Sequence, residues 1–327
     1  MEAIIYKNKE LDYKKVLGNI VDGVSRYLVE NNIKSQVLGI SGGIDSTVTA
    51  AICKLVHDKI GIPLIGLSLP CSTNADVEND SAIACGSEFC NSFKVLNLQE
   101  PYEIMEKFCA SASNIEKTPI SQGNVKARLR MITLYDIASK TNGIVMGTSN
   151  KTEWLTGFWT LHGDVGDLNP IGELWKTEVY ELARYLKDNV FNGSKALEKA
   201  MALIPTDGNG VNGGGDAEQI MPSYTYNEID HVLSTWNNLS PKIKPMYAAD
   251  KMTSSIKNTI FDVEDENSKI KRMEACGKSG SEFVPYLGDL YGVDSVRKVC
   301  MRSWNSEYKR KNLELCISLD NGNAIMH

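Results

Sequence analysis

The sequence lacks the features that mark several large protein classes. No apolar run approaches the ~18 residues of a membrane span. The polar start, MEAIIYKNKELDYKK, contains no signal-peptide core. Only 4 histidines are present, none in an HExxH pair, which disfavours a zinc hydrolase. We therefore expect a cytoplasmic protein with no membrane partner.

Paired cysteine motifs and a basic tract are also missing. The 8 cysteines form no CxxC pair, so we expect buried, reduced thiols rather than disulfides or zinc ligands. Lys and Arg number 35 against 41 Asp and Glu, which gives a net charge of −6. This acidic balance disfavours a nucleic-acid partner, and the missing CxxC disfavours tRNA thiolation. Hydrophobic residues make up 42%, as in ordinary globular proteins.

What the sequence does contain is a regular alternation of apolar runs and helical patterns in its first half. Buried strands are predicted at 37–41, 63–70, 93–98 and 143–148. Helices are predicted at 11–31, 47–56, 75–91, 101–113 and 124–140. Strands alternating with helices favour right-handed crossovers. The fold class expected is therefore α/β, a Rossmann-like doubly wound parallel sheet with helices on both faces.

The second half of the chain is less regular. One amphipathic helix is predicted at 176–187, a Gly-rich loop at 207–216, and a polar insertion at 237–280. The spacing Gly208-x-Gly210-x-x-Gly213 formally matches a dinucleotide fingerprint, but it follows no strand and opens no helix, so we interpret it as loop. No repeat or independent second domain is evident. We expect one domain over 1–327.

The strongest chemical motif is Ser41-Gly42-Gly43-Ile44-Asp45-Ser46, between a predicted strand and a predicted helix. Two glycines permit a tight turn, and backbone N–H groups at a helix N-terminus bind anions such as pyrophosphate. A carboxylate beside phosphates repels them unless a cation lies between, so Asp45 suggests a Mg²⁺ ligand. The alternative is a simple glycine turn with Asp and Ser capping the helix.

The motif SGGxDS resembles that of the PP-loop ATP pyrophosphatases, whose fold is adenine nucleotide alpha-hydrolase-like. Further segments, in the same order, resemble those of NAD synthetases. They are GNVKARLRM at 123–131, Gly147-Thr148, Glu153 with Thr156-Gly157-Phe158, Gly163-Asp164, DLNP at 167–170, Lys176, Pro205-Thr206 and SEYKR at 306–310. The chain is thus identified as a member of the ammonia-dependent NAD synthetase family.

The resemblance implies an activity, its substrates and a site. ATP adenylates the nicotinate carboxylate of deamido-NAD, pyrophosphate leaves, and ammonia displaces AMP to give NAD. It implies a homodimer and Mg²⁺ bound by Asp45 and Glu153. It implies catalytic roles for Asp45, Asp164 and Lys176. The ATP site would comprise Gly39, Ile40, Ser41, Gly42, Gly43, Ile44, Asp45, Ser46, Thr148, Lys176 and Thr206. The deamido-NAD site would comprise Arg128, Asp167, Tyr308 and Lys309.

The chain departs from the family pattern at a few positions. Leu161 stands where the family usually has Lys, Ser68 where it often has Arg, and Tyr308 where it usually has His. The first two motivate an alternative substrate, nicotinate mononucleotide. A different PP-loop adenylating enzyme and a non-catalytic nucleotide-binding module are further alternatives. Only 40 residues precede SGGIDS, too few for a glutamine-hydrolysing domain, so we expect ammonia as the nitrogen source.

Overall fold

The computed structural model describes residues 11–71, 74–112, 115–206, 216–237, 287, 290–306, 315–317 and 324–326. These residues fall into two compact units. The larger comprises residues 8–154, 158–216 and 311–327, and the smaller comprises 1–7, 155–157 and 217–310. The segments 207–215 and 238–286, which contain most of the predicted loop and insertion, lie outside the described residues.

A four-stranded parallel sheet forms the centre of the larger unit. Its strands are β1 (Ser35–Gly39), β2 (Leu64–Ser68), β3 (Ser92–Val95) and β4 (Gly143–Val145), in the order β3-β2-β1-β4. The register pairs Val37 of β1 with Ile65 of β2 and with Val145 of β4. All three pairings are parallel, so the carboxyl ends of the strands share one edge of the sheet.

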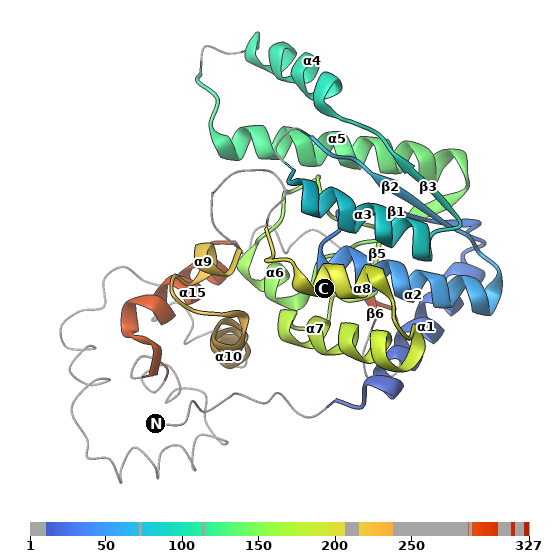
Figure 1. Ribbon diagram of the computed structural model, residues 1–327. Helices are drawn as coiled ribbons and strands as arrows, with labels where there is room; N and C mark the ends of the chain where they lie inside the picture. The colour runs from blue at the N-terminus through green and yellow to red at the C-terminus, as the bar shows by residue number, and fades with distance from the viewer. Residues whose placement is uncertain are drawn as a thin grey trace. The chain divides into compact units, whose positions relative to one another are not determined.

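Alternate residues of β1 pack against two different layers of helices. Leu38 lies in a core shared with α1 (Tyr13–Glu30), α2 (Ile44–Ile60), α3 (Asp76–Phe89), α7 (Lys176–Tyr185) and α8 (Lys195–Ala202). Val37 packs with Ala138 of α5 (Pro119–Lys140) on the opposite face. Successive strand side chains point to opposite faces, so helices cover both faces of the sheet. Figure 1 shows α5 on one side of the strands and α2 and α7 on the other. This confirms the predicted fold class.

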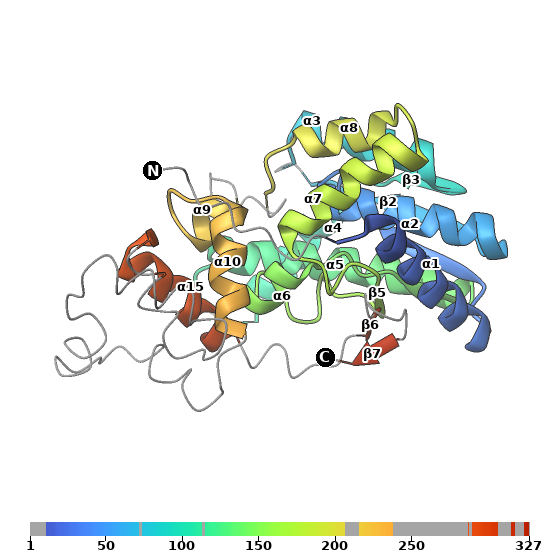
Figure 2. The same cartoon turned by 90° about the horizontal axis from the view of Figure 1, so that it is seen from below.

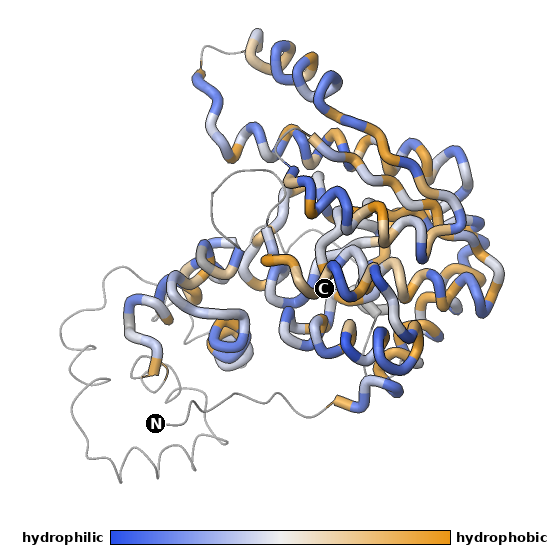
Figure 3. The backbone as a smooth tube through the Cα atoms, viewed as in Figure 1, coloured by the Kyte–Doolittle hydropathy of each residue, from blue (hydrophilic) through white to orange (hydrophobic). Residues whose placement is uncertain are grey.

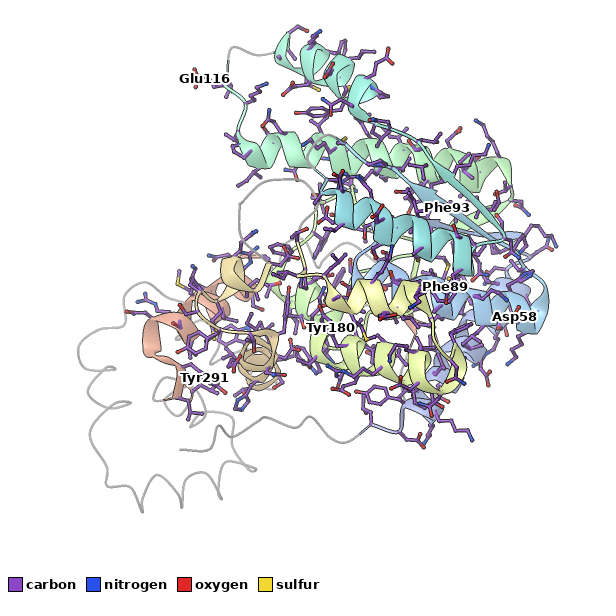
Figure 4. The ribbon with its side chains drawn as sticks, in the orientation of Figure 1. Asp58, Phe89, Phe93, Glu116, Tyr180 and Tyr291 are labelled. Carbon is purple, nitrogen blue, oxygen red and sulfur yellow. The ribbon has the colours of Figure 1, made fainter. Side chains whose placement is uncertain are left out.

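Helix α1 buries one face, whereas the central helix α2 is buried on nearly all sides. On α1 the buried side chains follow helical spacing, with Val16, Ile20, Val24 and Leu28 all inside. Figure 3 shows hydrophilic and hydrophobic segments alternating along α5, as expected of a helix with a single buried side. At α3 the packing is close enough to exclude a side chain at Gly86, where a Cβ atom would lie 2.2 Å from the Phe93 ring. Phe93 is labelled in Figure 4.

A second helix packs against α5 on the side of the sheet that α5 covers. α4 (Gln99–Ala110) precedes α5 along the chain and contacts it. Its Tyr102 is buried with Leu67, Leu69 and Leu98 in a small separate core. Ile104 and Phe108 of the same helix are 63% and 72% exposed.

A second, small sheet lies beyond β4. It contains β5 (Leu168–Asn169), β6 (Leu315–Ile317) and β7 (Ala324–Met326), with β5 parallel to β6 and β6 antiparallel to β7. Figure 2 shows these three strands together. A bridge between Met146 and Leu168 links the end of β4 to β5. The short helix α6 (Lys151–Thr156) follows β4, and a π-helical turn, η1 (Leu186–Val190), extends α7.

The smaller unit has its own apolar core. α9 (Asp216–Ile220) leads into α10 (Tyr226–Asn237), which contacts α15 (Val293–Asn305). Ile229, Leu233 and Trp236 of α10 are buried, as are Val296 and Val299 of α15. Within this unit, Arg302 donates a hydrogen bond of 3.2 Å to the Thr156 carbonyl.

Two further sequence predictions concern membranes and cysteines. Among the described residues, no helix has both the length and the apolar character needed to cross a bilayer. Six cysteines are described, and none of them forms a disulfide: Cys53, Cys71, Cys85, Cys90, Cys109 and Cys300. Burial raises the pKa of the Cys90 thiol to about 12. Cys109 is exposed, which differs from the predicted burial, because it lies on the outer helix α4.

Candidate active site

The motif Ser41–Ser46 occupies the turn between β1 and the start of α2, as predicted. Gly42 has a φ of +86°, a left-handed conformation that glycine adopts without strain. A Cβ atom there would lie 2.3 Å from the Glu78 carbonyl oxygen and 2.7 Å from the Ala82 nitrogen. The hydroxyl of the buried Ser81 donates a 2.7 Å hydrogen bond to the Gly42 carbonyl. The first turn of α3 therefore fixes the shape of this loop.

The loop ends in the N-terminus of α2. Gly43 is the N-cap residue, and Asp45 lies in the first turn. The first N–H groups of a helix have no intrahelical acceptor, and the positive end of its dipole adds attraction for anions. The hydroxyls of Ser41 and Ser46 lie 3.0 Å apart, and Ser46 donates to the Gly43 carbonyl over 3.1 Å. This end of α2 has the chemistry of an anion site.

Asp45, Glu153 and Lys176 converge on one point beside this loop. The Lys176 Nζ atom forms ion pairs with Asp45 Oδ2 and, at 3.1 Å, with Glu153 Oε1. The Lys176 side chain is 2% exposed, and those of Asp45 and Glu153 are 16% and 15% exposed. With all three groups ionised, the cluster carries one excess negative charge. Its two carboxylates are more exposed to solvent than its ammonium.

Sheet topology explains why these distant residues meet. β1 and β4 are parallel neighbours, so the segments that follow them leave the same edge of the sheet. The first carries Asp45 and the second carries Glu153 on α6. Lys176 is the first residue of α7, and its backbone N–H donates to Thr152 Oγ1 over 2.9 Å. Three helix N-termini thus place the three charged side chains together.

Burial and charge act in opposite directions on Glu153. Desolvation raises the pKa of its carboxyl well above the usual range, the Lys176 ammonium lowers this pKa, and the Asp45 carboxylate raises it again. Burial acts in the same direction at Tyr180 on α7, where it raises the pKa of the phenol against the Lys176 charge. Both shifts accord with the burial of the Lys176 side chain between these groups.

The two carboxylates fit a hard divalent cation. Both already bond to a single cationic atom, the Lys176 Nζ, so their oxygens converge. Among the described residues, no group of three or more His, Cys, Asp or Glu side chains could hold a metal ion. Mg²⁺ commonly binds one or two carboxylates and takes its other ligands from substrate phosphates and water. Asp45 and Glu153 beside a phosphate-binding loop match that pattern.

The remaining predicted ATP residues border the same loop. Gly39 ends β1, and the Ile40 N–H donates to the Leu67 carbonyl over 2.8 Å. Thr148 is half-buried in the segment between β4 and α6. Thr206 donates a 2.6 Å hydrogen bond to Glu78 Oε1, and the Glu78 carbonyl packs against Gly42. Thr206 is therefore tied to the residue that borders the glycine turn.

The predicted substrate residues are less closely gathered. Arg128 is exposed on α5 and donates over 3.2 Å to the Leu161 carbonyl. Asp164 accepts from the Thr160 N–H at 2.6 Å. Asp167 accepts from the Tyr135 hydroxyl at 2.8 Å and from the Val145 N–H at 3.0 Å. Tyr308 and Lys309 lie outside the described residues.

Several residues that shape the site were not predicted from the sequence. Asn150 contacts both carboxylate residues of the site, and Ser81 and Glu78 border the glycine turn. For Asn150 a signal did exist, because Asn-x-x-Glu at 150–153 is the spacing of a capping box at a helix start. For Ser81 and Glu78 the sequence holds no comparable signal, since they lie on a different helix from the loop.

The chain resembles known proteins in sequence and in structure. A family model described as NAD synthase matches residues 16–275. An NH(3)-dependent NAD(+) synthetase of Carboxydothermus hydrogenoformans is 36% identical over 207 residues, 63% of this chain and 79% of the relative. That of Thermoplasma volcanium is 35% identical over 228 residues, 68% of this chain and 84% of the relative.

Solved structures show the same likeness. An NMN synthetase from Francisella tularensis has a TM-score of 0.59 at 30% identity, covering 69% of this chain and 87% of its own. An NH3-dependent NAD synthetase from Campylobacter jejuni, in complex with the nitrate ion, has a TM-score of 0.54 at 27% identity, covering 76% and 93%.

Proposed function

Because the chain belongs to the NAD synthase family, we propose that it is a ligase that amidates deamido-NAD to NAD with ATP and ammonia. The relatives named NH(3)-dependent NAD(+) synthetase, 36% and 35% identical to it, support this activity. The observation that carries it is the buried Lys176 between Asp45 and Glu153, next to the Ser41–Ser46 loop. That arrangement suits chemistry on the phosphates of a nucleotide.

The reaction needs two displacements. In the first, a nicotinate carboxylate oxygen bonds to the α-phosphorus of ATP, and the bond to the departing pyrophosphate breaks. In the second, ammonia attacks the activated carbonyl carbon, loses a proton, and AMP leaves with the electrons of the C–O bond. Adenylation is needed because a free carboxylate is a poor electrophile with a poor leaving group.

In this proposal the loop and Lys176 hold the phosphates. The N–H groups at the start of α2 donate to pyrophosphate oxygens, while Ser41, Ser46, Thr148 and Thr206 supply hydroxyls. Lys176 Nζ moves from the two carboxylates to a phosphate oxygen when the nucleotide binds. Asp45 and Glu153 hold Mg²⁺, which when bound neutralises negative charge on the phosphates.

The substrate residues are proposed on resemblance. Arg128 and Lys309 supply positive charge for the dinucleotide, and Asp167 and Tyr308 supply hydrogen-bonding groups. Asp164 holds ammonium and accepts its proton as the amide forms. Its carboxylate accepts from the Thr160 N–H, which supports a fixed orientation for this side chain in the turn after Trp159. Thr160 in turn donates to Asn124 of α5 over 2.9 Å.

A second substrate, nicotinate mononucleotide, has one observation in its favour. The Francisella tularensis structure, described as an NMN synthetase, is 30% identical to this chain with a TM-score of 0.59. The apolar Leu161 lies beside Arg128, whose guanidinium bonds to the Leu161 carbonyl. A smaller anionic substrate would need fewer cationic contacts there.

The deciding experiment measures AMP and amide product with purified protein, ATP, Mg²⁺ and ammonium. We expect rapid turnover of deamido-NAD, slower turnover of nicotinate mononucleotide and none with glutamine as the nitrogen source. Faster mononucleotide turnover would overturn the substrate assignment. Adenylation of neither substrate would favour a different adenylating enzyme, and nucleotide binding without AMP release would favour a binding module. Asp45→Ala should abolish AMP release while the circular dichroism spectrum stays unchanged.

Two broader features belong to the same proposal. We place the enzyme in the cytoplasm, where its six described cysteines, none in a disulfide, would stay reduced. We also propose a homodimer. Side chains that support it are exposed and apolar on α4 and α5, namely Ile104, Phe108, Ile120 and Ile132. Exposed apolar groups of this size commonly mark protein contacts.

A further inference from the structure

Asn150 connects the two carboxylates through a single amide. Its Nδ2 atom donates to Asp45 Oδ1 over 2.8 Å, and its Oδ1 atom accepts from the Glu153 N–H at 2.9 Å. Its own backbone N–H donates to Glu153 Oε2 over 3.2 Å. The residue is fully buried. The contact to Asp45 joins residues 105 positions apart in the chain.

We infer that Asn150 is a positioning residue that holds Asp45 and Glu153 at a fixed separation and thereby sets the affinity for the divalent cation. The inference rests on the proposed function, since it assumes that these carboxylates hold a cation. Asn150 touches neither the cation nor the substrate in this account. It acts through Asp45 and Glu153 alone.

The orientation of the amide follows from its partners. The Glu153 N–H can only donate, so the side-chain atom facing it must be the oxygen. The other end is then the NH₂ group, which faces a carboxylate oxygen of Asp45 as a donor should. One end of the amide therefore caps α6 while the other restrains Asp45. Among side chains that cap helices well, only asparagine carries its donor on a different atom from its acceptor, so its two ends can reach two separate partners.

Hydrogen bonds also restrain the residues on either side of Asn150. Asn169 Nδ2 donates to the Ser149 carbonyl over 2.6 Å, and Asn169 is buried. Thr152, two residues further on, accepts from the Lys176 N–H at 2.9 Å. The start of α6 thus fixes the backbone of Lys176 as well as the carboxylates of Asp45 and Glu153. A rigid frame of this kind suits a residue whose task is orientation.

A simpler explanation is that Asn150 only caps α6. The reciprocal bonds between Asn150 and Glu153 form a capping box, which on its own stabilises a helix start. The two explanations separate under substitution. Serine and threonine also cap well, but their short hydroxyls cannot span the distance to Asp45. Asn150→Ser and Asn150→Thr therefore keep the cap and remove the restraint, whereas Asn150→Ala removes both.

The test compares these variants with Ser194→Ala, which removes an ordinary cap. Ser194 Oγ accepts from the Leu197 N–H at the start of α8, a helix that carries none of the site carboxylates. Mn²⁺ binding is titrated by electron paramagnetic resonance in the presence of ATP, without ammonium or nicotinate substrate. Thermal unfolding of each apoprotein is followed in parallel, and the Mg²⁺ dependence of AMP release gives kcat at saturating cation.

We expect the Mn²⁺ Kd of Asn150→Ser and Asn150→Thr to rise ten- to a hundredfold, the range typical of groups that orient metal ligands. Their thermal midpoints should stay close to wild type, and excess Mg²⁺ should restore most of kcat. Ser194→Ala should bind Mn²⁺ as wild type does. A Kd within twofold of wild type in both cap-keeping variants would overturn the inference, as would their unfolding.

This readout separates the inference from the proposed function. If the wild-type protein binds Mn²⁺ with ATP and the variants lose that binding, Asn150 has the assigned role whatever the nicotinate substrate is. If the wild-type protein amidates deamido-NAD but the variants bind Mn²⁺ normally, the function stands and the role of Asn150 is wrong. Absence of Mn²⁺ binding in the wild type would overturn the inference directly.

Discussion

Gly42 shows at the scale of one residue how backbone and packing restrict a position together. Its φ of +86° costs a residue with a side chain ~1–2 kcal/mol. A Cβ atom would in addition press to within 2.3 Å of the Glu78 carbonyl, which belongs to a helix and cannot easily move. The positive φ and the lack of space for a Cβ atom therefore both act on a residue of the loop that is proposed to hold phosphate.

We predict that Gly42→Ala lowers the free energy of unfolding by clearly more than ~2 kcal/mol, and that it eliminates AMP release. Gly61→Ala is the matched control, because Gly61 has a φ of +76° and nothing within 4 Å of the added Cβ. It should cost only ~1–2 kcal/mol and leave turnover intact. Urea denaturation of both variants measures the difference. Equal losses would show that the clash does not matter.

Lys176 is the other residue whose removal should be costly. We predict that Lys176→Met lowers the free energy of unfolding by ~3–5 kcal/mol, because two largely buried carboxylates lose their common counter-charge. Lys59→Met provides the control. Lys59 pairs with Asp22 on the surface, where the side chains are 47% and 62% exposed, and such a pair contributes up to ~1 kcal/mol. Similar losses in urea titrations of the two variants would contradict the prediction.

At the scale of secondary-structure elements, one carboxylate oxygen on α4 accepts hydrogen bonds from α4 itself, from α5 and from the segment between them. Glu106 Oε1 on α4 accepts from the Tyr102 hydroxyl at 3.0 Å, from Gln122 of α5 at 2.9 Å and from Lys117 at 2.9 Å. These bonds stabilise the ionised form and lower the pKa of Glu106 to about 2, with the Gln122 bond as the largest cause. Their contribution to stability therefore depends on pH.

A carboxyl whose pKa is lowered by folding stabilises the protein above its unfolded pKa and loses that effect as pH falls toward the folded value. For Glu106 this pH window runs from the ordinary pKa of 4.5 down to the pKa of about 2 in the folded protein. We predict that wild type has a higher thermal midpoint than Glu106→Gln above pH 5, and that the gap narrows below pH 4. Calorimetry across this range measures it. A gap independent of pH would contradict the assignment.

Most elements could be predicted from hydrophobic pattern, but their limits and the shortest ones could not. The strands β1 to β4 each begin within two residues of the start of the predicted runs at 37–41, 63–70, 93–98 and 143–148. The helix predicted at 124–140 begins earlier, at Pro119, because Thr118 accepts from the Ser121 N–H and proline suits a first helical position. β5, β6 and β7 were missed, since two or three residues carry no periodicity. The helices α8, α10 and α15 were missed as well, although they span 8, 12 and 13 residues and bury apolar side chains at helical spacing.

At the scale of the whole molecule, the proposed homodimer predicts a mass that can be measured in solution. We predict that light scattering gives a mass of twice the 36.1 kDa of the chain. Phe108→Asp, at a side chain that is 72% exposed on α4, should shift this mass toward the monomer. Val29→Asp, at a position 60% exposed on α1, is the control and should leave it unchanged. A monomeric wild type would contradict the proposed homodimer.

The site shows how far sequence reasoning reaches across the molecule. Asp45, Glu153 and Lys176 could be named in advance because their segments resemble those of a known family. Their convergence follows from the parallel order of β1 and β4. The amide that joins them could not be foreseen, because the bond between Asn150 and Asp45 depends on the register of two segments over 105 positions. Tyr308 and Lys309 stay predictions.

The long separation between the charged residues also has a consequence for synthesis of the chain. Lys176 follows Asp45 by 131 positions. While the ribosome is still adding those residues, β1, α2 and β2 can already associate, but Asp45 has no ammonium beside it. We therefore expect the site to close late in folding. A nascent chain arrested before α7 emerges should hold its sheet while its nucleotide-binding end stays open.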